Sequence, residues 1–186
     1  MSRFDIADTP LGGLKVVQRR ILTDERGSLC RLFCAEELEA AGFDAPIAQI
    51  NHSCTTRRGT VRGLHFQYPP HAEIKMISCL RGEVFDVAVD LRHGSPTFLR
   101  WYGKVLTAEN RASLVIPRGF AHGFQTLAED CELLYLHTRA YSSDAEGAVN
   151  AQDPSVAIAW PLAIAALSER DRSHPFLDDQ FSGVRL

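Results

Sequence analysis

The sequence predicts a single all-β domain, built as a sandwich or barrel of short strands. Between residues 47 and 139 it divides into short strand-forming segments separated by turn signals such as Arg81-Gly82 and Gly94-Ser95-Pro96. No helix is expected between these segments. Short strands without intervening helices are typical of a sandwich or barrel rather than of a parallel α/β sheet. At 186 residues, 45% of them hydrophobic, the chain is long enough for one domain with a substantial core, spanning residues 1–186. The expected strands cover 47–54, 60–67, 74–80, 83–91, 97–106, 112–117, 122–127 and 131–139.

The segment 83–91 shows the strand pattern most clearly. Its large apolar residues fall on one side, and its acids Asp86 and Asp90 fall on the other. Alternation with a period of two indicates a strand with one packed face.

The other expected elements lie on either side of this block of strands. Residues 14–17 begin an extended run, and residues 28–33 form a possible strand. Residues 35–41, A-E-E-L-E-A-A, give the best helix in the chain, closed by Gly42 at a C-cap position. Residues 162–169 form a possible second short helix. We therefore expect a few short helices at the periphery of the fold.

Composition narrows the class of protein. The net charge of −3 gives no argument for binding nucleic acid or an acidic membrane surface. No apolar run approaches the length of a membrane span, and the first residues show no signal-peptide core, so we expect a cytoplasmic protein. The five cysteines are an odd number without a C-x-x-C pair, which predicts free thiols, several of them small core residues.

Three basic side chains stand close together in the stretch from Gly59 to Lys75. Arg62 and His65 lie on one expected strand and Lys75 opens the next. A base, a guanidinium and an ammonium at this spacing suggest a site for an anionic substrate. An ordinary surface hairpin with solvated charges explains the stretch equally well.

A second motif raises the question of a metal. Residues 116–122, I-P-R-G-F-A-H, fit the P-x-G-x-x-H pattern that is typical of the second half of a cupin. A metal-binding cupin has H-x-H in its first half, whereas this chain has His65-Phe66-Gln67. Because a divalent metal needs three or four converging ligands, we expect no metal site. The metal-dependent alternative would have to use His65, His71, Glu73 and His122.

Motifs along nearly the whole chain carry a family resemblance. The chain resembles the dTDP-4-dehydrorhamnose 3,5-epimerases, which are nucleotide-sugar epimerases of deoxysugar biosynthesis. Any one motif is weak, but this many in order are highly specific. They are Q-I-N-H-S (49–53), R-G-L-H-F-Q (62–67), P-P-H-A-E-I-K (69–75), R-G-E-V-F-D-V-A-V-D-L-R (81–92), G-S-P-T-F (94–98), L-T-A-E-N (106–110), I-P-R-G-F-A-H-G-F (116–124), D-P-S-V-A-I-A-W-P (153–161) and L-S-E-R-D (167–171).

The resemblance implies a cupin-type jelly roll that works without metal or other cofactor. It also implies a homodimer whose N-terminal strands cross to the partner. The implied substrate is a 4-keto-6-deoxy sugar on a nucleoside diphosphate, whose ketone acidifies the hydrogens on carbons 3 and 5. A base removes one hydrogen to give an enolate, and an acid returns a proton to the opposite face.

The resemblance also assigns roles to four residues. His65 matches the base, Lys75 the cation beside the developing oxyanion, and Tyr135 the acid on the far face. From the residue alone, Tyr135 would more often be a core tyrosine with a satisfied hydroxyl. Asp171 matches the carboxylate that orients the histidine and favours its protonated form, with Asp86 and Asp153 as the alternatives.

Further matches concern substrate binding. Arg26 matches an arginine that reaches the diphosphate from the partner subunit, where a bidentate fork suits phosphate oxygens. The residues expected to line the sugar and diphosphate site are Gln49, Asn51, Arg62, His122 and Tyr141.

The run 28–31 departs from the family pattern. It reads S-L-C-R, so that Arg31 stands where an acid is commoner and an aromatic residue is missing. The expected catalytic set is intact, so the departure leaves open only which nucleotide is bound and whether both carbons are inverted. The first alternative is a mono-epimerase that acts on a CDP- or GDP-linked 4-keto sugar. The second, which ranks below it, is a metal-dependent cupin enzyme.

Overall fold

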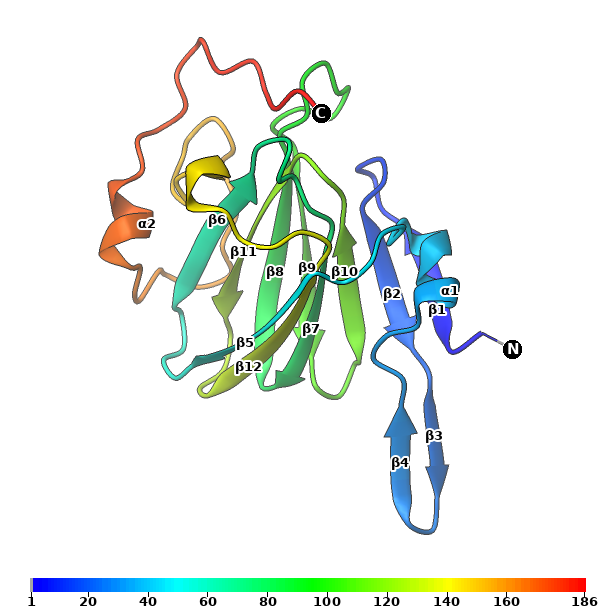
Figure 1. Cartoon of the computed structure of the whole chain (residues 1–186). Coiled ribbons are helices and arrows are strands. Elements are labelled where there is room, and N and C mark those ends of the chain that lie inside the picture. The colour runs from blue at the N-terminus through cyan, green and yellow to red at the C-terminus, as the bar shows by residue number, and fades with distance from the viewer. Residues whose placement is uncertain (1) are drawn as a thin grey trace.

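Two antiparallel sheets form the body of the protein. The computed structural model describes residues 2–186, and Figure 1 shows their course. The strands are β1 (Phe4–Asp8), β2 (Lys15–Arg19), β3 (Ile21–Asp24), β4 (Gly27–Cys30), β5 (Gln49–Thr55), β6 (Val61–Gln67), β7 (Lys75–Arg81), β8 (Glu83–Asp90), β9 (Trp101–Thr107), β10 (Ala112–Ile116), β11 (Phe120–Thr126), β12 (Cys131–His137) and β13 (Glu146–Ala148). The helices are α1 (Ala35–Leu38), the 3₁₀ turns η1 (Glu39–Ala41) and η2 (Ser143–Ala145), and α2 (Glu169–Ser173).

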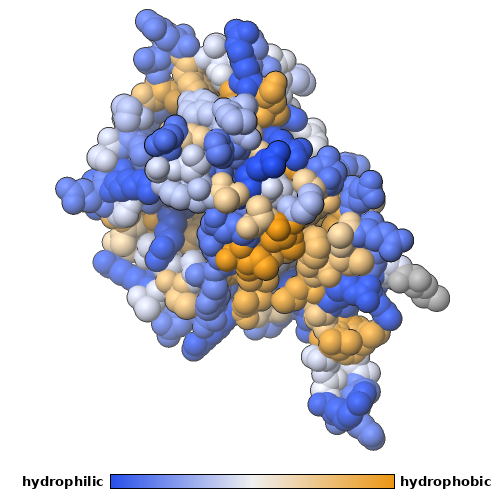
Figure 2. Space-filling model, in the orientation of Figure 1, coloured by the Kyte–Doolittle hydropathy of each residue, from blue (hydrophilic) through white to orange (hydrophobic). Residues whose placement is uncertain are grey.

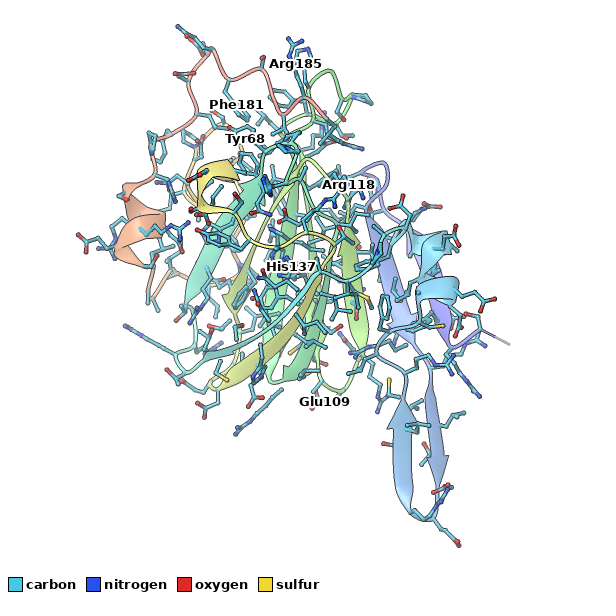
Figure 3. All side chains as sticks on the ribbon, viewed as in Figure 1. Tyr68, Glu109, Arg118, His137, Phe181 and Arg185 are labelled. Carbon is cyan, nitrogen blue, oxygen red and sulfur yellow. The ribbon has the colours of Figure 1, made fainter. Side chains whose placement is uncertain are left out.

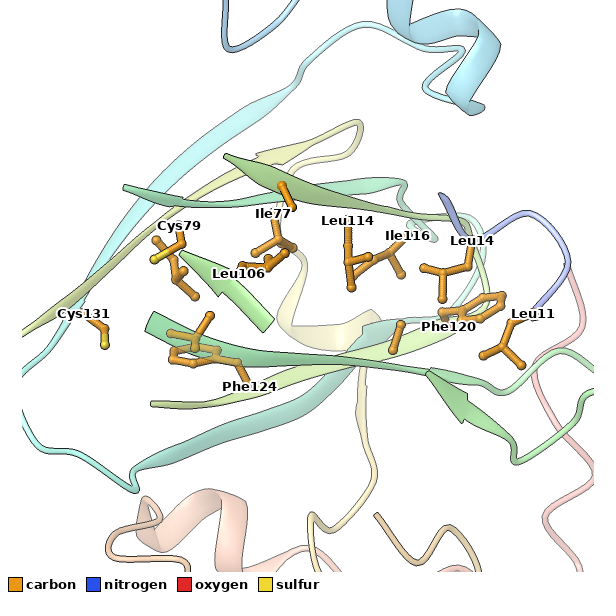
Figure 4. Close-up of a cluster of buried hydrophobic side chains, with 14 residues drawn as sticks. Leu11, Leu14, Ile77, Cys79, Leu106, Leu114, Ile116, Phe120, Phe124 and Cys131 are labelled. Carbon is orange, nitrogen blue, oxygen red and sulfur yellow. The ribbon is translucent and has the colours of Figure 1, made fainter. Parts of the chain in front are cut away.

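The sheets face each other as in a jelly roll. Across residues 2–186, a six-stranded sheet runs β1-β2-β10-β7-β12-β5 and a five-stranded sheet runs β13-β6-β11-β8-β9. Side chains from the inner faces of both sheets meet in one cluster, which includes Ile77 and Leu114 from one sheet and Leu106 and Phe124 from the other (Figure 4). Each fully buried side chain of this size contributes about 1.5–3 kcal/mol of hydrophobic stabilisation.

Both sheets are also covered on their outer faces. The α1–η1 turn packs Leu38 and Ala41 on the six-stranded sheet, against strand residues such as Val17. The C-terminal segment packs Val156 and Val184 on the five-stranded sheet. Strands that are packed on both faces bury their polar residues too, so the two acids of β8 do not face water as a half-exposed strand would predict.

The expected strands from 47 to 139 are all present, with shifted ends. The expected strand 97–106 begins later, at Trp101, because residues 95–100 form turns in which Thr97 binds Asp90. The expected helix 35–41 is confirmed as α1 and η1, and Gly42 ends it with φ 82°.

The expected helix at 162–169 is wrong. The backbone of this segment binds the start of β6 and the turn before it, since Val61 N–H donates to Ala166 O and Ala165 N–H donates to Gly59 O. These bonds hold the segment in a non-helical course with one isolated bridge between Thr60 and Ala166, and the helix begins only at Glu169, where Ser168 caps it. The sequence reading also missed β1, and β4 ends at Cys30, short of the expected residue 33.

A hairpin projects from the body. Strands β3 and β4 pair only with each other among the described residues, and Figure 1 shows them extending away from the sheets. Leu22 and Leu29 are cross-strand partners on this hairpin, and they are 42% and 69% exposed. Figure 2 shows apolar surface where the hairpin joins the body and a hydrophilic tip.

Candidate active site

One cavity collects almost all of the residues that the sequence singles out. It has a volume of about 1120 Å³ and opens between the two sheets, with α2 at its rim. Arg26 alone among the expected site residues lies outside it. The expected residues that line the cavity are Gln49, Asn51, Arg62, His65, Lys75, His122, Tyr135, Tyr141 and Asp171.

His65 and Asp171 form a hydrogen-bonded pair in this cavity. His65 Nε2 lies 2.8 Å from Asp171 Oδ1, and the Gly63 N–H donates to the other carboxylate oxygen at 3.3 Å. Burial by itself raises the pKa of Asp171, but the His65 hydrogen bond and charge outweigh it and the pKa is lowered. Because the carboxylate stays charged, Nε2 carries the proton of this bond, and Nδ1 keeps the lone pair of the neutral ring.

The other two candidate carboxylates have different partners. Asp86 Oδ1 lies 2.8 Å from His122 Nε2, and both side chains are buried. Burial raises the pKa of Asp86, and the nearby His122 opposes this effect. Asp153 accepts the backbone N–H groups of Ser155 and Leu177. Asp171 is therefore the carboxylate that holds His65.

Gly63 brings the two histidine-bearing strands together. Its φ is +119°, and a Cβ added there would lie 2.6 Å from the Gly123 Cα. Only glycine fits such a close approach of two backbones. The close contact lets β6 and β11 pair with His65 directly opposite His122.

Lys75 is held at the end of a chain of polar contacts. Its Nζ lies 3.0 Å from Glu73 Oε1 and donates to the His65 carbonyl oxygen at 3.1 Å. Gln67 Nε2 donates to Glu73 Oε2 at 2.7 Å, and Gln67 Oε1 accepts the Ser142 N–H at 2.7 Å. Gln67, which stands where a cupin ligand histidine would be, thus anchors the carboxylate that positions Lys75.

Tyr135 faces the cavity from the opposite sheet. It lies on β12 of the six-stranded sheet, whereas His65 lies on β6 of the five-stranded sheet. Burial raises the pKa of the phenol, and its hydroxyl lies 3.3 Å from Ser53 Oγ. A phenol with a raised pKa remains protonated at neutral pH, so it can donate a proton when a strong base forms beside it.

His137 is a cavity residue that the sequence reading missed. It lies two residues after Tyr135 on the same face of β12, and the two rings stack with an interplanar angle of 9°. Burial, and then the charge of Lys75, lowers its pKa to about 4, so its ring is neutral at neutral pH. Figure 3 places it near the middle of the jelly roll. The period of two on β12 could have indicated it.

The rim of the cavity is a separate polar network. Gln49 contacts Asn51 at 3.2 Å through its Nε2, and its Oε1 accepts the Tyr141 N–H at 2.9 Å. The Tyr141 hydroxyl donates to Glu146 at 2.9 Å, and Glu146 pairs with Arg170 of α2. Sequence reasoning missed Glu146, which lies in none of the quoted motifs, and Arg170, because the L-S-E-R-D motif was used only for Asp171.

Arg62 lies on the exposed side of β6, and its Nη2 contacts the Cys54 carbonyl oxygen at 3.4 Å. Its guanidinium therefore remains accessible from the cavity, which is the property that an anion-binding arginine needs.

Arg26 and Arg31, which the sequence singles out, have different environments. Arg26 lies at the tip of the β3–β4 hairpin, where it pairs with Asp24. Arg31 pairs with Glu37 of α1, and Glu37 also accepts the Arg3 N–H at 2.6 Å. The unusual cation at position 31 therefore holds the base of the hairpin against α1 and lies outside the cavity.

The ligand set of the metal-dependent alternative does not converge. Within residues 2–186, His65, His71, Glu73 and His122 do not form a group with donor atoms close enough to share an ion. Two other groups do have donor atoms within 4.8 Å of one another. These groups are His52 with Cys54 and Glu132, and His65 with Asp171 and His174.

Comparison with known proteins decides the family. The family model described as dTDP-4-dehydrorhamnose 3,5-epimerase matches residues 8–179. The chain belongs to the dTDP-4-dehydrorhamnose 3,5-epimerase family. The epimerase is 40% identical to the Salmonella typhimurium dTDP-4-dehydrorhamnose 3,5-epimerase over 175 residues, which cover 93% of this chain and 95% of the relative. It is 44% identical to the Pseudomonas aeruginosa enzyme of the same name over 155 residues, covering 82% and 84% of the two chains.

Solved structures confirm the jelly-roll fold. RmlC from Legionella pneumophila in complex with dTDP-4-keto-L-rhamnose superposes with a TM-score of 0.91 at 38% identity, covering 98% of each chain. ChmJ, a 3'-monoepimerase from Streptomyces bikiniensis in complex with dTDP-quinovose, gives 0.84 at 36% identity, covering 90% of this chain and 85% of that one. The epimerase is therefore an isomerase-class enzyme. None of its described helices has the length and apolar character that crossing a membrane requires.

Proposed function

We propose that this epimerase inverts carbons 3 and 5 of dTDP-4-dehydro-6-deoxy-D-glucose to give dTDP-4-dehydro-L-rhamnose. The observation that carries the proposal is the placement of His65 and Tyr135 on opposite sheets that face one cavity. Inversion requires removal of a proton from one side of the sugar ring and delivery to the other. A base and an acid on facing sheets meet that requirement.

His65 takes the proton from the carbon next to the ketone. Its Nδ1 holds the free lone pair, because Nε2–H is committed to Asp171. Asp171 fixes the ring orientation and stabilises the imidazolium that forms. The Lys75 ammonium, positioned by Glu73, then stabilises the negative charge that develops on the ketone oxygen.

Tyr135 returns a proton to the opposite face of the enolate. The phenol is protonated before the reaction, and the enolate is a strong enough base to draw its proton. The buried His122–Asp86 pair and the neutral His137 ring form the polar floor on which the sugar lies. The cycle needs neither a cofactor nor a metal.

The substrate diphosphate is bound by Arg62 and, in a homodimer, by Arg26 of the second copy. The proposal is supported by the projecting hairpin, which carries Arg26 at its tip and the exposed pair Leu22 and Leu29 along its length. Strands β1 and β2 pair within their own sheet, so the hairpin is the part of the N-terminal region that is free to reach another subunit.

Mixing two inactive variants tests this dimer. Arg26→Ala and His65→Asn should each lose most of their activity as separate proteins. After subunit exchange at equal amounts, activity should recover to about a quarter of the wild-type value, because about half of the dimers are mixed and each holds one intact site. A mixture no more active than the mean of its components contradicts the shared site.

The activity itself is tested by solvent exchange in heavy water. The enzyme is given dTDP-, CDP- and GDP-linked 4-keto-6-deoxy sugars, and NMR follows carbons 3 and 5 separately. We expect deuterium and inversion at both carbons with the dTDP sugar. Inversion at carbon 3 alone would indicate a mono-epimerase, as ChmJ is described. The absence of exchange with all three sugars would refute the proposed function. The cytoplasmic location expected from the sequence stays a prediction.

A further inference from the structure

A third donor side chain stands beside the His65–Asp171 pair. His174 follows α2 directly, and one of its ring nitrogens lies within 4.8 Å of the donor atoms of both His65 and Asp171. The rings of His65 and His174 meet edge to face, with their centroids 6.5 Å apart. The proposed mechanism gives His174 no task.

The position of His174 is fixed by the backbone. Its carbonyl oxygen accepts the side-chain N–H of the buried Asn150 at 2.7 Å. Its Nε2, in contrast, is buried and has no hydrogen-bond partner among residues 2–186. A buried ring nitrogen without a partner is a costly arrangement unless something else satisfies it.

Two imidazoles and one carboxylate form a familiar donor set for divalent transition metals. We propose that His65, Asp171 and His174 bind such an ion, with zinc as its representative, and that the bound ion inhibits the epimerase. The inhibitory part of this inference rests on the proposed role of His65 as the base. Zinc bonded at about 2.0–2.2 Å needs donor atoms about 3.3 Å apart, so the three side chains would have to move closer together than the 4.8 Å limit within which they now lie.

Inhibition follows from the chemistry of the His65 ring. A metal on Nε2 takes the place of the proton that is donated to Asp171. The neutral ring then carries its single proton on Nδ1, so that no lone pair is left for the substrate proton. The ion therefore competes with the proton at the base, while the reaction itself proceeds without any metal.

The second donor group provides an internal control. His52, Cys54 and Glu132 lie on the exposed side of β5 and β12, and His52 already binds Glu132 at 3.1 Å. Arg81 lies 3.7 Å from the same carboxylate, and its charge opposes a cation there. Zinc bound to this group would leave the His65 ring untouched.

The experiment measures binding and inhibition separately. Cobalt(II) absorbance follows binding to the chelator-treated enzyme without any turnover, and zinc is titrated into the solvent-exchange assay. The variants are His174→Phe, which keeps a ring against His65, His174→Gln, and the control Cys54→Ser. In both His174 variants we expect the zinc concentration for half-inhibition to rise roughly tenfold or more. Their turnover without zinc should stay near that of the wild type.

Each outcome decides between the possibilities. Equal zinc inhibition in the wild type and both His174 variants, or inhibition that disappears in Cys54→Ser, overturns the proposed site. A wild-type enzyme that turns over but neither binds cobalt nor responds to zinc also overturns it. Cobalt binding that depends on His174, in an enzyme with no activity on any of the three sugars, supports the metal site and refutes the proposed function instead.

Discussion

Replacing Tyr135 with phenylalanine should separate the two halves of the reaction. The change removes one hydroxyl and almost no volume, so packing on β12 is kept. The lost contact is the 3.3 Å interaction between the Tyr135 hydroxyl and Ser53 Oγ. Ser53 is only partly buried, so its hydroxyl can bind water instead. We therefore expect a stability loss of at most about 1 kcal/mol. Loss of the acid should lower the rate of inversion by about 10²–10⁴, which corresponds to about 3–5 kcal/mol in the barrier.

The assay for this variant is NMR of sugar recovered from heavy water. His65 can still remove a proton and return deuterium to the same face, so deuterium should appear in sugar of the original configuration. Ser53→Ala is the matched control, because it removes the partner of the hydroxyl and keeps the phenol. It should retain inversion. Inverted product from Tyr135→Phe at near the wild-type rate would refute the assignment, and the acid would then be water or Tyr141.

Four further results are expected. In His65→Asn, solvent exchange at both carbons should fall roughly a thousandfold, while the circular dichroism spectrum stays unchanged. A variant that keeps more than about a tenth of the wild-type activity would show that His65 is not the base. Asp171→Asn should lower turnover by about a hundredfold or more, because the amide no longer fixes the tautomer of the ring. Dialysis against a chelator should leave activity intact; restoration of lost activity by zinc, iron or manganese would contradict the metal-free mechanism. The pKa of Glu37 is lowered from 4.5 to about 2, chiefly by the Arg3 N–H, so its stabilising effect is complete above pH 4.5 and is lost as the pH falls towards 2. The difference in unfolding temperature between the wild type and Glu37→Gln should therefore shrink across this range.

The strands could be predicted because their local signals agree with the packing. Alternating apolar residues and turn residues placed β5 to β12 within a few residues of their ends. The segment 162–169 failed because its apolar residues suggest a helix, while the hydrogen bonds that fix its backbone come from Gly59 and Val61. A pattern within the segment holds no information about partners a hundred residues away.

In the active site too, residues close together in the sequence could be predicted, whereas contacts between distant residues could not. His65 and Lys75 stand close together in the sequence, and a chemical reading of one stretch finds them. Asp171 could be placed only through the family resemblance, since its contact with His65 joins residues far apart in the chain. Residue 174 carries no motif of its own, and its position beside the pair became visible only when α2 was placed against β6.

The hydrogen-bond partners of the two cavity histidines support the proposed proton-transfer mechanism. His65 and His122 face each other across β6 and β11, where a metal-binding cupin would direct both rings at one ion. Here each ring has its own carboxylate, Asp171 for one and Asp86 for the other. A histidine held by a carboxylate through one nitrogen has a fixed tautomer and a second nitrogen free for a substrate proton. In the proposed mechanism, two separate carboxylates in place of one shared ion therefore allow His65 to act as a base instead of a metal ligand. Gln67 holds Glu73 against Lys75, and in the proposed mechanism the Lys75 ammonium brings to the ketone oxygen the positive charge that an ion would otherwise supply.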